Sequence, residues 1–134
     1  MKQILVIDDE FPLCELLKQI IEQENEGEFL VDYATQAREA VDKLLARNYD
    51  LALMDIKLSG QTTGIDILKK VKDSVRTKFL IYSALAKEAQ WPLLVREGVD
   101  PMVLDYLEKS NDLSIDEFMA LIKKLLIPSR ESDL

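Results

Sequence analysis

The sequence predicts an α/β fold in which five parallel strands alternate with five helices. Short apolar runs stand at 4–7, 29–33, 51–54, 79–82 and 103–107. Most of these runs are apolar on both faces, as expected of strands that helices cover on each side. Segments with helical periodicity lie between and after them, at 12–25, 36–47, 64–74, 86–97 and 114–127. This alternation, with right-handed crossovers, predicts a doubly wound sheet in the order 2-1-3-4-5 with helices on both faces.

The first half of the chain carries a local signal for each element. "ILVI" (4–7) is wholly apolar, and Pro12 suits the first turn of the helix that follows. Asp32 interrupts the run at 29–33, which places that strand at an edge of the sheet. Thr35 is expected to cap the helix over 36–47. "LALM" (51–54) has no polar residue, as expected of a central strand.

The second half carries similar signals and one conflict. Pro92 falls inside the fourth helical segment, so we expect 85–91 to be irregular and the helix to restart at Pro92. Asp105 interrupts "VLDYL" (103–107), which places this strand at the other edge. Ser114 and Glu117 are expected to form a capping box for the last helix. The expected architecture is the flavodoxin-like (βα)5 arrangement over residues 1–127, with 128–134 as a flexible tail.

Composition excludes several classes of function. The 134 residues match one domain, and 17 basic against 25 acidic residues give a net charge of −8. This charge disfavours direct nucleic-acid binding. No histidine is present, which excludes Ser-His and Cys-His nucleophile pairs and histidine zinc sites. Cys14 is the only cysteine, and we find neither a signal peptide nor an apolar run of membrane-spanning length. We therefore expect a cytoplasmic protein without membrane insertion.

Polar residues follow four of the five strands. Asp8 and Asp9 follow the first run, Asp55 the third, Ser83 the fourth and Lys109 the fifth. In a sheet of order 2-1-3-4-5 these four strands are neighbours, and ligands bind beyond their carboxyl ends. The sequence therefore predicts one shallow site with three carboxylates, a hydroxyl and an ammonium group.

Each of these groups has a chemical use in phosphoryl transfer. Carboxylates suit Mg²⁺, which would relieve their mutual repulsion. A carboxylate is also a nucleophile toward phosphorus and yields an aspartyl phosphate. The transferred group needs electrostatic stabilisation, which Mg²⁺, Lys109 and the Ser83 hydroxyl would supply.

The sequence resembles the receiver domains of two-component response regulators over roughly residues 2 to 127. The matching stretches are the Asp8-Asp9 pair, "LMDIKL" with Asp55, Ser83-Ala84, and "DYLEK" with Lys109. The resemblance implies that Asp55 is the phosphoacceptor and that Ser83 and Lys109 bind the phosphoryl group. It implies a Mg²⁺ site made by Asp9, Asp55 and the backbone carbonyl of Lys57, with Asp8 acting through water. Tyr106 would be the switch aromatic that turns inward when Ser83 moves to the phosphate.

The resemblance also implies the partners. A sensor histidine kinase or a histidine phosphotransfer protein presents phosphohistidine, and the receiver catalyses its own phosphorylation and dephosphorylation. A surface around the fourth helix and fifth strand then changes and binds a downstream protein target. Only seven residues follow 127, so we expect a stand-alone receiver that acts through protein contact.

The chain departs from the family pattern near the expected site. Ser110 replaces a proline that usually follows the lysine through a cis bond; a cis bond before serine would cost about 2.5–4 kcal/mol. The stretch from Gly98 to Lys109 is longer than usual. Ser59 also replaces a common proline, and Lys57 is close enough to the expected site to alter phosphate loss.

Two hypotheses from different classes remain open. The first is the phosphoaccepting switch, and the second is a receiver-like interaction module that works without phosphate. The acidic residues favour the first, since a module without Mg²⁺ has no need of repelling carboxylates. An aspartate-nucleophile phosphohydrolase fits less well, because no Asp-x-Asp follows "ILVI".

Overall fold

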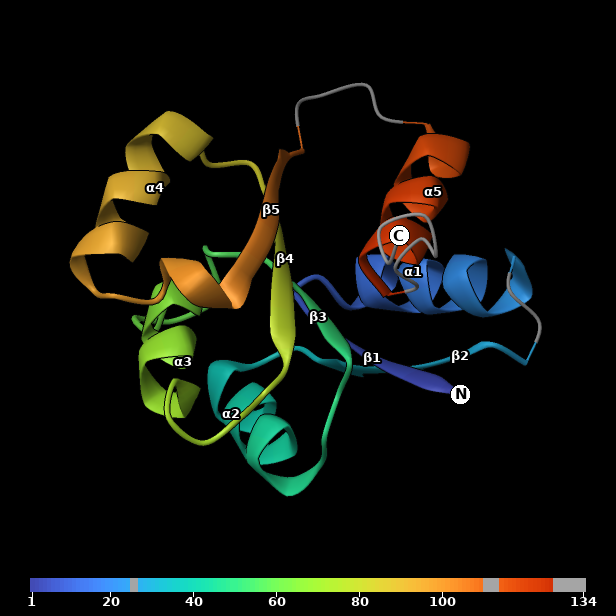
Figure 1. Ribbon diagram of the computed structural model, residues 1–134, viewed down its shortest axis with the longest axis horizontal. Coiled ribbons are helices and arrows are strands. Elements are labelled where there is room, and N and C mark those ends of the chain that lie inside the picture. Colours follow the sequence, from blue (N-terminus) through green and yellow to red (C-terminus); the bar gives the residue numbers. More distant parts are fainter. Residues whose placement is uncertain (25–26, 110–113, 127–134) are drawn as a thin grey trace, which may run out of the picture.

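The computed structural model describes residues 1–24, 27–109 and 114–126, which form a layered α/β fold (Figure 1). The five parallel strands lie in the order β2-β1-β3-β4-β5. Their bounds are β1 (Lys2–Ile7), β2 (Phe29–Ala34), β3 (Leu51–Met54), β4 (Lys78–Ser83) and β5 (Val103–Glu108). The predicted strand order is confirmed, and the strands that carry Asp32 and Asp105 are the two edges.

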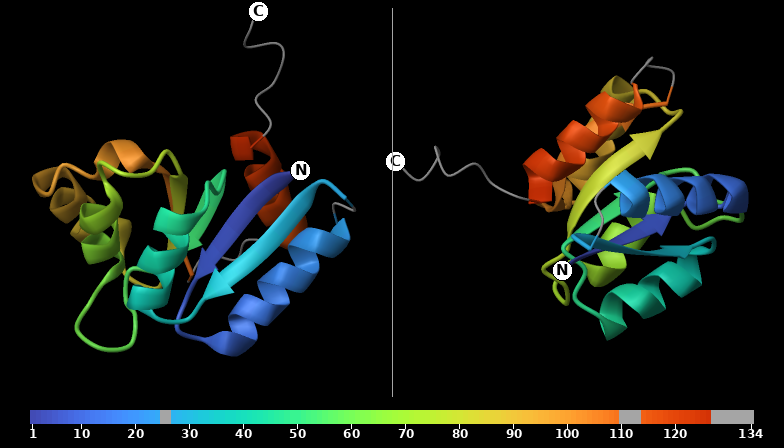
Figure 2. Two further views of the ribbon diagram at one scale, coloured as in Figure 1. Left: turned by 90° about the horizontal axis from the view of Figure 1, so that it is seen from below. Right: turned by 90° about the vertical axis from the view of Figure 1, so that its right-hand side faces the viewer.

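The helices cover both faces of the sheet (Figures 1 and 2). Helices α1 (Phe11–Glu24) and α5 (Ile115–Leu126) pack on one face, and α2 (Ala37–Ala46), α3 (Gly64–Val71) and α4 (Lys87–Arg96) pack on the other. Successive side chains of a strand point to opposite faces. Ile4 and Val6 therefore join the core under α1 and α5, while Leu5 and Ile7 join the core under the other three helices. This two-sided burial explains why "ILVI" is apolar throughout.

Side-chain caps mark the start of two helices. Thr63 and Asp66 form a reciprocal capping box at α3, in which the Asp66 carboxylate accepts from the Thr63 N–H at 2.9 Å. At α5 the Ser114 hydroxyl accepts from the Glu117 N–H at 3.1 Å, as the sequence predicts.

The predicted cap at α2 is wrong. Gln36, not Thr35, is the N-cap of α2, and its side chain makes no capping hydrogen bond. The Thr35 N–H instead donates to Oε1 of Glu39 at 2.9 Å. The helix therefore begins one residue later than the local pattern predicts.

The predicted break at Pro92 is also wrong, because α4 runs through this residue. Proline lacks the N–H that would bond to the carbonyl of Glu88 four residues earlier. Glu88 and Pro92 are both exposed, so water has access to this part of the helix. Backbone hydrogen bonds from Gln90 to Ala86 and from Glu97 to Leu93 continue the helix on either side.

The long connection before Lys109 is absorbed by a short 3-10 helix, η1 (Asp100–Met102), which the sequence did not predict. Gly98 precedes it with a φ of 69°, a conformation that favours glycine. The pairing of β4 with β5 then shifts register between Phe79 and Leu80 and leaves Leu104 exposed.

Within the described part of the chain, no helix has the length and apolar character needed to cross a membrane. Ser110 and the expected tail at 128–134 lie outside the described residues.

Candidate functional site

The pairing of β1 with β3 brings two acidic residues side by side. Ile7 pairs with Met54, and the next residues along the two strands are Asp8 and Asp55. The Asp55 N–H donates to the Ile7 carbonyl at 2.9 Å, which extends the sheet pattern one step beyond β3. Both aspartates thus lie at the carboxyl edge of the sheet, where such folds bind ligands.

The three predicted carboxylates form one cluster. Asp8, Asp9 and Asp55 each offer an oxygen that lies within 4.8 Å of the other two. Asp8 is 4% exposed and Asp55 is 8% exposed, while Asp9 is half-buried. Burial of like charges at this spacing is unfavourable unless a cation is close. The arrangement therefore has the character of a cation site.

Lys109 supplies one cation within the cluster. Its Nζ donates to Oδ2 of Asp8 at 3.0 Å and to Oδ2 of Asp55 at 3.1 Å. The Lys109 N–H also donates to the Ser83 carbonyl at 2.7 Å, which ties Lys109 to the end of β4. Burial works to lower the pKa of the Lys109 ammonium, but the two carboxylates outweigh it, so this pKa lies above its ordinary value.

The pKa of the Asp8 carboxyl lies above its ordinary value. Burial is the main cause, and the charge of Asp55 acts in the same direction. Hydrogen bonds from the Glu10 N–H, at 2.9 Å, and from Lys109 offset only part of this effect. One ammonium group is therefore too little compensation for three carboxylates, and a second cation would stabilise the site.

The donor set fits Mg²⁺. All three side chains offer oxygen, and the hollow of about 750 Å³ that Asp9 and Asp55 line leaves room for water ligands, which Mg²⁺ usually retains. The Lys57 N–H donates to Oδ1 of Asp55 at 3.3 Å, and Lys57 also borders the hollow. That the backbone carbonyl of Lys57 is a fourth protein ligand of the metal remains a prediction.

Ser83 and Tyr106 meet at the backbone of Leu85. The Ser83 side chain is fully buried, and its hydroxyl accepts from the Leu85 N–H at 3.2 Å. The Tyr106 hydroxyl donates to the Leu85 carbonyl at 2.7 Å, and its ring is buried. Burial raises the pKa of Tyr106, so the phenol remains a hydrogen-bond donor at neutral pH. One residue thus joins the predicted phosphate ligand to the predicted switch aromatic.

The contact that holds Asp9 was not predicted from the sequence. The Ser59 hydroxyl donates to Oδ2 of Asp9 at 2.8 Å, across 50 residues of chain. The only signal in the sequence was that Ser59 stands in the loop after Asp55, at a position where the family usually has proline. Groups that hydrogen-bond a metal-ligating carboxylate orient it and raise metal affinity.

We expect Ser59→Ala to weaken Mg²⁺ binding by about tenfold, because Asp9 loses the donor that orients it. Calorimetric titration of the purified protein with MgCl₂ measures this effect. Ser59→Thr is the matched control, since it keeps the hydroxyl, and should bind within about twofold of the parent. Equal affinities of all three proteins would show that the Ser59–Asp9 hydrogen bond has no part in cation binding.

Fold and site together define a class of protein: a doubly wound α/β domain with an acidic, cation-competent site and a lysine at the carboxyl edge of its sheet. A family model for the response regulator receiver domain matches residues 4–123. The chain belongs to this family. A receiver domain implies a cognate histidine kinase, and the acidic pocket with Lys109 is consistent with aspartyl phosphorylation.

Curated relatives and solved structures agree with this assignment. The chain is 33% identical to the transcriptional regulatory protein ResD of Bacillus subtilis over 124 residues, 92% of this chain and 48% of ResD. It is 28% identical to the response regulator ArlR of Staphylococcus aureus, covering 100% of this chain and 57% of ArlR. The chain thus spans about half the length of these relatives.

Among solved structures, a response regulator receiver domain protein of Methanospirillum hungatei superimposes with a TM-score of 0.79 at 26% identity, covering 98% of each chain. The response regulator TrrA of Thermotoga maritima, solved with Mg²⁺ and BeF, superimposes with a TM-score of 0.71 at 30% identity. That match covers 94% of this chain and 100% of TrrA.

Proposed function

We propose that this protein accepts a phosphoryl group on Asp55 from a phosphohistidine of a partner kinase or phosphotransfer protein. The observation that carries the proposal is the position of Asp55. This carboxylate lies in the cluster with Asp8 and Asp9, and its Oδ2 is 3.1 Å from Nζ of Lys109. The similar TrrA structure, solved with Mg²⁺ and BeF, supports a metal at the corresponding place here.

The transfer step uses groups that this chain holds in place. A carboxylate oxygen of Asp55 attacks phosphorus, so that a P–O bond forms while the P–N bond of the phosphohistidine breaks and the imidazole leaves. Because this chain has no histidine, the donor must come from the partner. Lys109 lies where its ammonium can compensate negative charge on the phosphoryl oxygens. Mg²⁺ bound by Asp8, Asp9 and Asp55 supplies further electrostatic stabilisation.

The same site accounts for release and signalling. Water attacks the phosphorus of the aspartyl phosphate and restores the Asp55 carboxylate, with inorganic phosphate as product. The same site that accepts the phosphoryl group thus also catalyses its hydrolysis. When the Ser83 hydroxyl moves to the phosphoryl group, the Leu85 N–H loses its acceptor. Tyr106 donates to the carbonyl of Leu85, so this change reaches β5 and the surface that meets a downstream protein.

Acetyl phosphate tests the proposal without the partner. We expect the protein with Mg²⁺ and acetyl phosphate to gain the mass of one phosphoryl group after rapid quenching, and Asp55→Asn to gain none. Asp73→Asn, an exposed aspartate in the turn after α3, is the matched control and should be modified like the parent. Omission of Mg²⁺ should abolish the gain.

If the folded parent protein gains no mass under rapid quenching, the phosphoacceptor role is wrong. The chain would then be a receiver-like interaction module that works without phosphate, with Ser110 and the stretch before Lys109 as the first positions to compare with phosphorylated relatives. A gain that persists in Asp55→Asn would place the phosphoryl group on another residue.

A further inference from the structure

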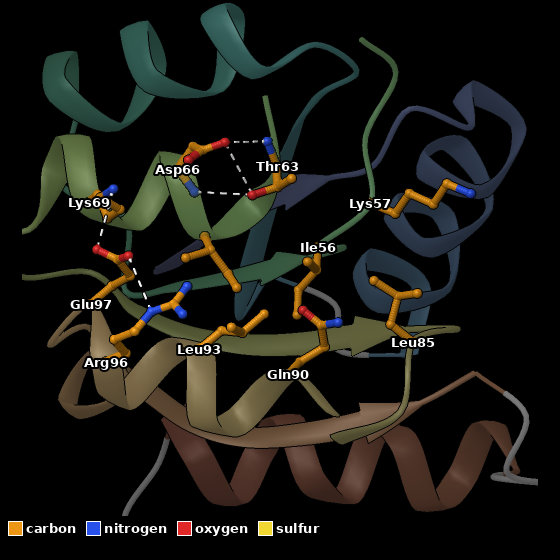
Figure 3. A pocket seen from close by; sticks show the side chains of 11 residues that line it. Ile56, Lys57, Thr63, Asp66, Lys69, Leu85, Gln90, Leu93, Arg96 and Glu97 are labelled. Carbon is orange, nitrogen blue, oxygen red and sulfur yellow. Dashed lines mark hydrogen bonds and ion pairs between the residues drawn. The ribbon is translucent and has the colours of Figure 1, made fainter. Parts of the chain in front are cut away.

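A second hollow opens beside the acidic site, between α3 and α4 (Figure 3). It measures about 360 Å³, within the range of natural ligand pockets. We call it the α3–α4 groove. Its apolar floor consists of Ile56, Ile65, Leu85 and Leu93, and the basic residues at its rim are Lys57, Lys69 and Arg96.

The rim has more positive charge than its own carboxylates neutralise. Lys69 and Arg96 share a single partner, the Glu97 carboxylate, at 3.3 Å and 3.8 Å. The other acidic residue of the groove, Asp66, is engaged in the capping box of α3. Among the described residues, no carboxylate lies within ion-pair distance of Lys57 at the opposite end. The groove is thus a local cationic feature on a chain of net charge −8.

The groove also shares lining residues with the acidic site described above. Lys57 and Leu85 line both hollows. The backbone of Leu85 donates to the Ser83 hydroxyl and accepts from the Tyr106 hydroxyl, while its side chain forms part of the groove floor. Leu85 is thus a physical connection through which a change in the position of Ser83 would reach the groove.

We propose that the α3–α4 groove docks a short amphipathic acidic segment of a partner protein. Apolar side chains of the segment rest on the floor, and its carboxylates face the basic rim. The coupling of this docking to phosphorylation rests on the proposed function of Asp55, whereas the docking itself does not. An acidic segment is favoured because its carboxylates would meet the surplus positive charge of the rim while its apolar side chains contact the floor.

The test uses a synthetic amphipathic peptide of leucine and glutamate, with a twin in which lysine replaces each glutamate. We expect the acidic peptide to shift amide resonances of groove residues in ¹⁵N-labelled protein, and the basic twin to leave them unchanged. Leu93→Glu should weaken binding at least about tenfold. Val95→Glu is the matched control on the same helix, because Val95 is exposed and lies outside the groove, and it should bind within about twofold of the parent.

Arg96→Glu tests the rim without altering the floor, since Arg96 is largely exposed. We expect it to lower the affinity for the acidic peptide at least about threefold. The proposal is wrong if neither peptide binds, if both bind alike, or if the shifts fall on α1 and α5. If the protein forms a dimer without peptide, and this dimer makes the groove inaccessible to the peptide, a second copy of the chain occupies the groove instead.

Phosphorylation of Asp55 is measured separately, by intact mass. The phosphoacceptor proposal and the docking proposal can therefore be rejected independently of each other. Once acetyl phosphate has modified the protein, peptide affinity should change by about fivefold or more, the range of ordinary coupling between two sites. Binding to the unmodified protein with no mass gain would support docking and reject the role of Asp55. Mass gain with unchanged peptide affinity would overturn the coupling through Leu85.

Discussion

We expect Lys109→Met to lower the rate of Asp55 phosphorylation by at least about 100-fold, as loss of one charge-stabilising donor commonly does. The substitution should also lower the free energy of unfolding of the Mg²⁺-free protein by about 2 kcal/mol, somewhat less than for a fully buried pair. The reason is that Nζ of Lys109 contacts Asp8 at 3.0 Å and Asp55 at 3.1 Å. Without it, no lysine or arginine among the described residues forms an ion pair with the three clustered carboxylates. Quenched-flow mass spectrometry and urea denaturation measure the two effects.

Two controls separate this effect from a general loss of charge. Lys43→Met removes a lysine that pairs with Asp32 at 3.0 Å on the edge strand β2, and it should leave the phosphorylation rate unchanged. Saturating Mg²⁺ should restore more stability to Lys109→Met than to the parent, because the metal replaces the lost cation. Equal Mg²⁺ stabilisation of both proteins would contradict the charge argument.

We expect Gly64→Ala to destabilise the protein by about 1–3 kcal/mol, the usual cost of overpacking, and to slow phosphorylation. A Cβ on Gly64 would lie 2.7 Å from the Asp55 carbonyl oxygen and 3.0 Å from Cα of Ile56. The Gly64 N–H also donates to the Ile56 carbonyl at 2.7 Å, so α3 begins directly against the backbone of the phosphoacceptor loop. The new methyl group must move this loop, the helix start, or both.

Gly27→Ala is the matched control, with a different cause of strain. A Cβ on Gly27 meets no atom within 4 Å, but its φ of 74° is unfavourable for alanine and should cost about 1 kcal/mol. This position precedes β2, at the opposite end of the strands from the acidic site. We therefore expect Gly27→Ala to lower stability without changing the phosphorylation rate. A Gly64→Ala protein of unchanged rate would show that the loop absorbs the methyl group.

Individual residues show which predictions from local sequence patterns hold and which fail. Asp8 and Asp55 were predictable as neighbours, because each directly follows an apolar run and the carboxyl ends of parallel strands meet at one edge. The helix over Lys87–Arg96 was predicted in position but not in continuity, since α4 accommodates Pro92 at a place where Glu88 and Pro92 are both exposed. Thr35 failed as a cap because α2 begins at Ala37, which makes Gln36 the N-cap.

The strand order, the acidic cluster and the family could all be predicted from the sequence, because they depend on periodicity and on which residues end the strands. Three features became visible only in the folded protein: Lys109 contacts Asp8 across 101 residues, Ser59 holds Asp9, and a cationic groove adjoins the site. These features depend on side-chain directions and on loop paths between distant elements. No local pattern encodes them, because loops have no hydrophobic period and their course is set by what they pack against.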